Sequence, residues 1–279
     1  MSGARAIDLL LADVDGTLVT QEKVLTPEAV AAARDLRAAG IRLAVTSGRP
    51  PRGMAMLVEP LALDDAIAGF NGGVFVNPDL SVIESRLLSR DVAAEAVRLI
   101  TEKGLDAWVY TEHDWLIRDP NAAHVAREAW TVKFDAKVVP AFTAEHFANT
   151  VKVVGVSDDY TRVAEAEAEA QRVLGEHASA ARSQPYYLDV TNPNANKGAV
   201  VDALARIYGL DPARIATIGD MPNDVLMFRR SGFSIAMGNA SDEVKAKAHA
   251  VTDSNEENGF ARAVRRFILG GAPAGEARS

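Results

Sequence analysis

The 279-residue sequence contains no cysteine, and its five histidines show no metal-ligand spacing. Disulfides, zinc–thiolate sites and thiol nucleophiles are therefore excluded, which fits a reducing compartment. The apolar run Leu9-Leu10-Leu11 ends almost at once in Asp13, so neither a secretion signal nor a membrane span is predicted. A net charge of -8 argues against nucleic-acid or anionic-membrane partners. We expect a soluble, cytoplasmic protein of one large or two smaller domains.

The two ends of the chain alternate apolar runs with helical patterns. Residues 7–12 are continuously apolar apart from one Asp, as in a strand buried on both faces. A helix follows, with Thr26 as its N-cap, Pro27 at its first position and Gly40 after its end. Further strands are predicted at 41–46, 66–70, 215–218 and 233–237, and further helices at 197–209, around 223–224 and at 260–269. This alternation predicts a Rossmann-like α/β core with a parallel sheet.

The middle of the chain has a different pattern, with paired short strands such as 107–111 and 115–118. Its Glu-Ala repeat at 165–170 alternates like a strand, but both residue types favour a solvated helix. We therefore predict a core made of residues 1–83 and 189–279, interrupted by an inserted α/β domain at residues 84–188.

Polar side chains follow the apolar runs of four predicted strands. They are Asp13 and Asp15, Ser47, Asn71, and Asp220 with the nearby Asp224. Ligands of an open parallel sheet bind beyond the carboxyl ends of its strands, so these groups should share one crevice. Carboxylates brought together there repel each other unless a cation compensates. Mg²⁺ prefers such oxygen ligands, and the lack of Cys or His in these loops disfavours a softer metal.

Lys197 is a second clue to an anionic site. A lysine in the first turn of a helix opposes the helix dipole, at a cost of about 0.3–1 kcal/mol. A phosphate group beside an aspartate would offset that cost. The Ser47 hydroxyl and backbone N–H groups near Gly48 could also donate to phosphate oxygens.

The order of these segments resembles the four motifs of the haloacid dehalogenase superfamily of phosphatases. The segments are Asp13-Val-Asp-Gly-Thr, Ser47-Gly-Arg, Lys197-Gly and Gly219-Asp-Met-Pro-Asn-Asp. The Ser-Gly-Arg, Asn71-Gly-Gly and Asn258-Gly-Phe elements look like its Cof-like branch, which has a large (type IIB) α/β cap. The resemblance covers nearly the whole chain, and its first and fourth motifs are the most specific. One departure is Met221-Pro222, where the family often has glycine or another small residue.

The resemblance implies a role for each matching residue. Asp13 would be the nucleophile that accepts the phosphoryl group, and Asp15 the general acid and base. Ser47 and Lys197 would neutralise charge on the phosphoryl oxygens. The implied Mg²⁺ ligands are the side chains of Asp13 and Asp220 and the backbone carbonyl of Asp15, with Asp224 as a supporting ligand. The implied substrate-binding residues are Gly48, Arg49, Asn71 and Asn223.

The inserted domain would be the cap that selects a small phosphorylated metabolite, such as a sugar phosphate. Candidate contacts near its return to the core are Tyr186, Tyr187, Asp189 and Asn194. For Tyr186, Tyr187 and Trp115, packing within the cap is the stronger reading. Asn71 between glycines also fits a simple turn, and Asp224 a helix start.

Two rival functions use similar residues. A sugar-phosphate mutase or phosphotransferase would pass the phosphoryl group from Asp13 to a hydroxyl instead of water. A non-catalytic phosphometabolite-binding protein would be expected to lack Asp13 or Asp15, and a phosphate-responsive receiver module has no cap of this size. The sequence therefore favours an enzyme.

Overall fold

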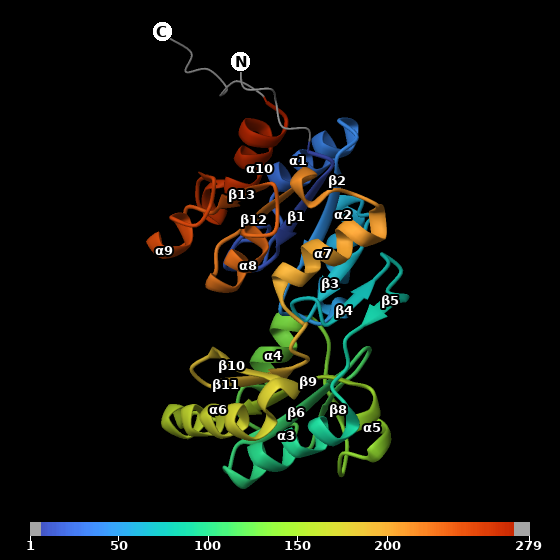
Figure 1. The fold of residues 1–279 in the computed structure, drawn as a ribbon, viewed down its shortest axis with the longest axis vertical. Helices are drawn as coiled ribbons and strands as arrows, with labels where there is room; N and C mark the ends of the chain where they lie inside the picture. Colours follow the sequence, from blue (N-terminus) through green and yellow to red (C-terminus); the bar gives the residue numbers. More distant parts are fainter. Residues whose placement is uncertain (1–6, 271–279) are drawn as a thin grey trace.

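The computed structural model describes residues 7–270, which form two bodies, each built on one β-sheet (Figure 1). The upper body in Figure 1, the core, has eight strands in the order β14-β13-β12-β1-β2-β3-β4-β5. The lower body, the cap, has six strands in the order β10-β11-β9-β6-β7-β8. The cap strands all come from the chain between β5 and α7, so the cap is an insertion into the core.

The strands and helices of the core come from both ends of the chain. Its strands are β1 (Leu9–Asp13), β2 (Arg42–Thr46), β3 (Ile67–Gly69), β4 (Val74–Val76), β5 (Val82–Ser85), β12 (Ile215–Gly219), β13 (Phe233–Ala236) and β14 (Ala250–Val251). Its helices are α1 (Pro27–Ala38), α2 (Val58–Leu61), α7 (Lys197–Tyr208), α8 (Val225–Phe228), α9 (Asp242–Lys245) and α10 (Gly259–Ala263). Short 3₁₀ segments include η1 (Pro51–Leu57) and η4 (Pro222–Asp224).

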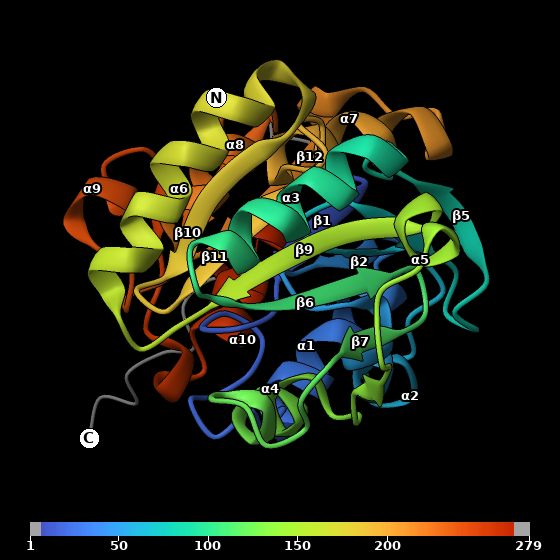
Figure 2. The same ribbon diagram turned by 90° about the horizontal axis from the view of Figure 1, so that it is seen from below.

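The cap is formed by one continuous stretch of chain. Its strands are β6 (Asp106–Thr111), β7 (Trp115–Ile117), β8 (Lys137–Val138), β9 (Thr150–Val156), β10 (Ser179–Gln184) and β11 (Tyr187–Thr191). Its helices are α3 (Arg90–Glu102), α4 (Val125–Val132), α5 (Ala144–Ala148) and α6 (Tyr160–Leu174). Figure 2 shows α3 and α6 lying across the side of the cap sheet that faces away from the core.

The direction of the core strands places the predicted site. From β14 to β3 all neighbouring strands are parallel, and only the edge strands β4 and β5 pair in antiparallel fashion. β1 lies between β2 and β12, with Asp13 opposite Thr46 and Ala12 opposite Ile218. The carboxyl ends of these three strands therefore meet at one edge, which faces the cap (Figure 1).

Strand β1 is apolar at nearly every position because helices cover both faces of the core sheet. Leu10 and Ala12 belong to the cluster that includes residues of α1 and α10. Leu9 and Leu11 belong to the cluster on the other face, with residues of α7 and α8. Since side chains alternate along a strand, only a continuous apolar run can supply both layers.

The sequence signals for helix ends are confirmed. The Thr26 hydroxyl accepts a hydrogen bond from the Ala29 N–H at 3.2 Å, and Pro27 begins α1. Gly40 follows the helix in the left-handed region, at φ +74°. The predicted hairpin is β6 with β7, and the Glu-Ala repeat lies in helix α6.

The structure corrects one element. Asn223 and Asp224 do not lie on the helix but in the preceding 3₁₀ turn η4, and α8 begins only at Val225. The physical reason is that the Asp224 side chain accepts hydrogen bonds from two N–H groups of its own loop, which keeps the loop wound around it.

The predicted domain boundaries fall inside two strands. β5 runs to Ser85 and pairs with β4 of the core, while β11 begins at Tyr187 and pairs with β9 of the cap. We therefore propose placing the borders of the insertion a few residues later, after β5 and after β11. Residues 1–6 and 271–279 of the predicted core lie outside the described residues. Within 7–270, none of the helices has the length and apolarity needed to cross a membrane.

Truncation of Leu10 tests the two-layer core. Leu10 has no exposed surface, so Leu10→Ala should lower the free energy of unfolding by about 2–5 kcal/mol through lost burial and a cavity. Urea denaturation followed by circular dichroism measures it. The control is Leu226→Ala, because Leu226 is 41% exposed. It should change the free energy of unfolding by no more than about 0.5 kcal/mol. Equal losses in the two variants would contradict this packing.

Candidate active site

Three buried charged side chains meet at the carboxyl edge of the core sheet. Asp13 ends β1, Lys197 begins α7 and Asp224 closes η4. The Lys197 ammonium donates to Asp13 Oδ1 at 2.6 Å and to Asp224 Oδ1 at 2.5 Å. Their side chains are at most 5% exposed, so each charge depends on the others for compensation. The anionic environment that Lys197 needs is therefore present in the protein itself.

Asp224 also shapes the loop that carries Asp220. Its second carboxylate oxygen accepts hydrogen bonds from the backbone N–H groups of Asp220 at 2.9 Å and Met221 at 2.8 Å. A Cβ on Gly219 would lie 2.4 Å from the Asp224 carboxyl carbon, so only glycine permits this approach. Asp224 thus fixes both Lys197 and the neighbouring loop.

Asp220 is held by three residues from two other loops. The Thr17 hydroxyl donates to Oδ1 at 3.4 Å, and the Asn239 amide donates to Oδ2 at 3.1 Å. Gly16 adopts φ +84°, and a Cβ there would lie 2.4 Å from Asp220 Oδ2. Gly16 and Thr17 of the Asp-Gly-Thr sequence therefore both serve the fit of this loop against Asp220.

Burial and neighbouring charges shift the pKa values of these groups. Burial would lower the pKa of Lys197, but attraction to Asp13 and Asp224 outweighs it and the pKa is raised. Burial raises the pKa of Asp13 well above its ordinary value, and Lys197 offsets only part of the effect. Burial and then the charge of Asp224 raise the pKa of Asp220 to about 6. One lysine therefore does not fully compensate three carboxylates.

The arrangement suits a divalent cation. Asp13, Asp220 and Asp224 each offer one oxygen, and these oxygens lie within 4.8 Å of one another. Asp13 Oδ2 is buried and has no hydrogen-bond partner among the described residues, which is costly for a carboxylate oxygen. Both oxygens of Asp220 and of Asp224 already accept hydrogen bonds, so Asp13 Oδ2 is the carboxylate oxygen of this group that remains available to a cation. Hard oxygen donors of this kind fit Mg²⁺.

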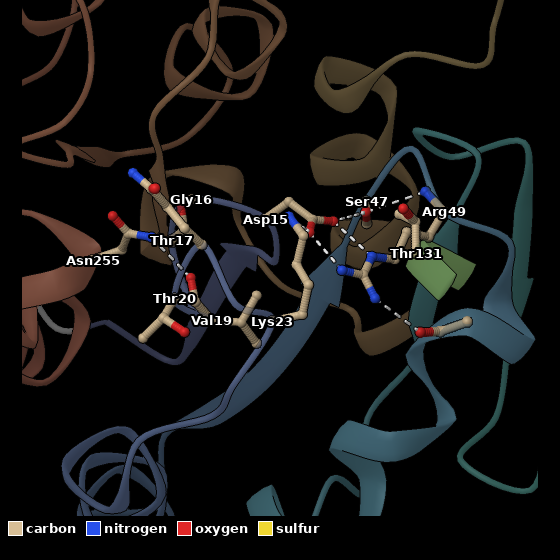
Figure 3. A network of polar contacts seen from close by, with 12 residues as sticks. Asp15, Gly16, Thr17, Val19, Thr20, Lys23, Ser47, Arg49, Thr131 and Asn255 are labelled. Atoms are coloured by element: carbon tan, nitrogen blue, oxygen red, sulfur yellow. Dashed lines mark hydrogen bonds and ion pairs between the residues drawn. The ribbon is translucent and has the colours of Figure 1, made fainter. Parts of the chain in front are cut away.

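The carboxylate of Asp15 lies apart from that group, held by two cations (Figure 3). Arg49 donates to it from Nε at 2.7 Å and from Nη2 at 2.5 Å. Lys23, from the loop after Asp15, lies 2.7 Å from the same carboxylate. Burial would raise the pKa of Asp15, but Arg49 and Lys23 outweigh it and the pKa is lowered. A metal contact by Asp15 would therefore use its backbone carbonyl and stays a prediction.

The remaining predicted residues lie around Asp15. The Ser47 hydroxyl donates to Asp15 Oδ2 at 3.4 Å and accepts from the Arg49 N–H at 3.1 Å. Asn71, in the left-handed region at φ +56°, donates its N–H to the Ser47 carbonyl at 2.8 Å. The Asn223 amide donates to Asn71 Oδ1 at 3.5 Å. A Cβ on Gly48 would lie 3.6 Å from the Asn71 amide nitrogen, so Gly48 and Asn71 are neighbours.

Sequence reasoning missed Lys23, Thr17 and Asn239. Thr17 belongs to the Asp-Gly-Thr motif, so the motif itself could have indicated it. Lys23 sits in a loop with no motif, and Asn239 lies 19 residues from its partner Asp220. No local pattern marks either of them, because their roles depend on how distant loops fold together.

The family follows from a comparison with known proteins. The model of the haloacid dehalogenase-like hydrolases matches residues 10–264, and the chain therefore belongs to this family. The fold brings together Asp13, Lys197 and the Gly219–Asp224 loop, which belong to the motifs on which the resemblance rested.

Its relatives narrow the class further. The chain is 28% identical to the 5-amino-6-(5-phospho-D-ribitylamino)uracil phosphatase YwtE of Bacillus subtilis, over 92% of this chain and 97% of that one. A haloacid dehalogenase-like hydrolase from Bacteroides thetaiotaomicron is similar in structure, with a TM-score of 0.87, 26% identity and coverage of 93% and 99%. A subclass IIB sugar phosphatase, BT4131, shares the fold with a TM-score of 0.79, 23% identity and coverage of 94% and 99%. The Cof-like assignment is thus confirmed, and the protein is a phosphatase.

Cation binding should weaken below about pH 6. Asp220 has a pKa of about 6 without metal, so below that pH a proton competes with the cation for its carboxylate. The apparent Mg²⁺ affinity of chelator-treated protein should fall about tenfold for each pH unit below 6. Calorimetric titration at pH 5 and pH 7.5 measures it. Equal affinities at the two pH values would argue against Asp220 as a ligand.

Removing the central lysine should destabilise the metal-free protein. Lys197→Met leaves Asp13 and Asp224 buried without a cation, which should lower the free energy of unfolding by about 3–5 kcal/mol. Mg²⁺ should raise the melting temperature of this variant more than that of the wild type, because the ion replaces part of the lost charge. The control Lys247→Met, at an exposed lysine, should behave as wild type. A stable variant indifferent to Mg²⁺ would refute this account.

Proposed function

We propose that this phosphatase hydrolyses a small phosphorylated metabolite, a sugar phosphate or similar phosphomonoester, through an aspartyl-phosphate on Asp13 with Mg²⁺ as cofactor. The main supporting observation is that Asp13 Oδ2 is buried without a hydrogen-bond partner in residues 7–270, on a side chain grouped with Lys197, Asp220 and Asp224. The names of the relatives, among them a phosphatase of a ribityl phosphate compound, support this substrate class. Location in the cytoplasm stays a prediction.

In the first half-reaction, an Asp13 carboxylate oxygen attacks phosphorus and the ester P–O bond breaks. Asp15 gives a proton to the leaving oxygen, which departs as a hydroxyl group. Lys197 and the Ser47 hydroxyl stabilise the negative charge of the phosphoryl oxygens. The residues that would hold Mg²⁺ are Asp13, Asp220 and the Asp15 carbonyl, with support from Asp224, and the bound ion would supply positive charge next to the nucleophile and the phosphoryl group.

In the second half-reaction, a water molecule attacks phosphorus and the bond to Asp13 breaks. Asp15 takes a proton from that water, and inorganic phosphate is released. The lowered pKa of Asp15 beside Arg49 and Lys23 keeps its carboxylate ionised and therefore able to accept this proton. In the first half-reaction the dianionic substrate competes with Asp15 for the two cations, which lets Asp15 hold the proton it must donate.

Replacement of the nucleophile should abolish turnover. Asp13→Asn is nearly isosteric and removes the attacking charge, so phosphate release should fall by at least about a thousandfold while the protein still folds. Malachite-green detection of phosphate and circular dichroism measure the two properties. Normal turnover in the folded variant would defeat the mechanism.

Asp15→Asn should slow both half-reactions, because the amide neither donates nor accepts the proton. The expected loss in kcat is about 100- to 10,000-fold. Phosphate release by the variant and the wild type is compared on phosphorylated sugars, nucleotides and cofactors, with Mg²⁺ or excess chelator.

The same assay of the wild type separates the proposed phosphatase from a mutase. Isomerised sugar phosphate without net phosphate release would indicate a mutase.

A further inference from the structure

The core-facing side of the cap sheet carries its own set of polar side chains. α3 and α6 cover the opposite side, while α4 lies between the sheet and the core (Figures 1 and 2). Tyr110 of β6 contacts Phe70, the residue before Asn71, with ring centroids 5.5 Å apart. A Cβ on Gly53 of η1 would lie 2.9 Å from the Val132 carbonyl of α4. This side of the cap is therefore docked beside the catalytic edge.

Five residues form what we call the cap cluster: Tyr110, Glu128, Lys152, Tyr187 and Asp189. Lys152 Nζ lies 2.7 Å from Asp189 Oδ2, and the Tyr110 hydroxyl donates to Glu128 Oε1 at 2.7 Å. Burial raises the pKa of Glu128, while the Tyr110 hydrogen bond and the positive charges of Lys152 and Arg49 oppose the rise. The positive charge of Arg49, which binds Asp15, therefore also acts on Glu128 of the cluster.

The cluster contains polar atoms with unused hydrogen-bonding capacity. Asp189 Oδ1 and the Tyr187 hydroxyl are buried and lack a hydrogen-bond partner within the described part of the chain. The same holds for Nε1 of Trp115, whose ring stacks on Tyr110. By contrast, the neighbouring Trp108 donates to Asp106. Each unsatisfied buried polar group is unfavourable, so a bound molecule with hydrogen-bond donors and acceptors would satisfy several of them at once.

Tyr186, adjacent in sequence, is explained by packing. Its ring stacks on His124 with centroids 4.2 Å apart, and the Arg127 guanidinium lies 5.4 Å from its centroid. Asn194 lies in the linker after the cap, where its carbonyl accepts from Arg86 at 2.5 Å. Of the candidates near the return of the cap, Tyr187 and Asp189 are therefore the ones in the cap cluster.

The charges of the cluster determine what kind of group it accepts. Glu128 and Asp189 bring two carboxylates and Lys152 one ammonium, which is already paired with Asp189. A hydroxyl group both donates and accepts, so it can satisfy the free Asp189 oxygen and the Tyr187 hydroxyl. A carboxylate or second phosphate would meet the unpaired Asp189 oxygen, which carries charge of the same sign, while Lys152 and Arg49 are already paired with Asp189 and Asp15.

We propose that the cap cluster selects phosphomonoesters whose leaving group is uncharged and hydroxyl-bearing, and rejects those with a second anionic group. The inference rests on the proposed phosphatase function and assigns Asp189, Lys152 and Glu128 as specificity-determining residues. The cap cluster would distinguish substrates that differ only in their leaving group. Asp13 and Lys197 would not distinguish them, since in the proposed mechanism they contact only the phosphoryl end.

A matched pair of substrates tests the selection. Glucitol 6-phosphate and 6-phosphogluconate have the same chain length and differ at the far carbon, a hydroxymethyl group against a carboxylate. The wild type should favour glucitol 6-phosphate in kcat/KM by tenfold or more, as an order of magnitude for like-charge rejection. Asp189→Asn, which removes one negative charge, should bring this ratio down toward one. The control Glu169→Gln, at a cap carboxylate paired with Arg172 on α6, should keep the wild-type ratio.

Lys152→Met provides a second, opposite variant. It removes the positive charge of the cluster, so the preference for glucitol 6-phosphate should increase. This variant still tests the proposal if Asp189→Asn fails to fold. Phosphate release from p-nitrophenyl phosphate reports on the catalytic edge separately. If the wild type hydrolyses that ester but shows no preference within the pair, or if both variants keep the wild-type ratio, the cap-cluster proposal alone is overturned. If the wild type releases phosphate from no ester, the proposed function falls and the inference with it.

Discussion

The double ion pair of Lys197 with Asp13 and Asp224 is the interaction on which the rest of the site depends. It joins the end of β1, the start of α7 and the turn η4, three segments far apart in the sequence. Removal of water from these charges is expensive, and their mutual attraction offsets it only at short distance. Asp224 extends this effect to the Asp220 loop through two backbone hydrogen bonds. The loop that supplies the acidic residues is therefore positioned by the same lysine that would face the phosphoryl group.

Asp13 and Asp15 sit in opposite electrostatic environments although only one residue separates them. Asp13 lies among carboxylates, and its pKa is raised by burial. Asp15 points away from that group toward Arg49 and Lys23, which lower its pKa. This separation follows from the end of β1 and the sharp turn at Gly16. Two chemically identical side chains thereby differ in the way that the proposed roles of nucleophile and proton carrier require.

The cap adds a second polar environment beside the first. Its core-facing side combines buried aromatic rings with Glu128, Lys152 and Asp189, and Arg49 lies close enough for its charge to affect Glu128. The proposed function thus assigns the chemistry to the core sheet and the selection of substrates to the cap sheet. The phosphoryl end of a substrate would meet the parallel strand ends of the core, and its remainder would meet the mostly antiparallel sheet of the cap. Such a division allows one core to serve different substrates through changes in the cap.

The sequence by itself determined the parallel α/β core, the insertion and the main charged residues. Continuous apolar runs followed by Asp13, Ser47 or Asp220 identify buried strands and their functional ends, since both depend on local pattern. The sequence did not reveal that Lys23 and Arg49 hold Asp15, that Asn239 holds Asp220, or that Asp224 lies in a turn before α8. Those contacts join loops whose separation in sequence carries no periodic signal. Only the tertiary structure brings them together, because charge pairing and hydrogen bonding depend on distance in space.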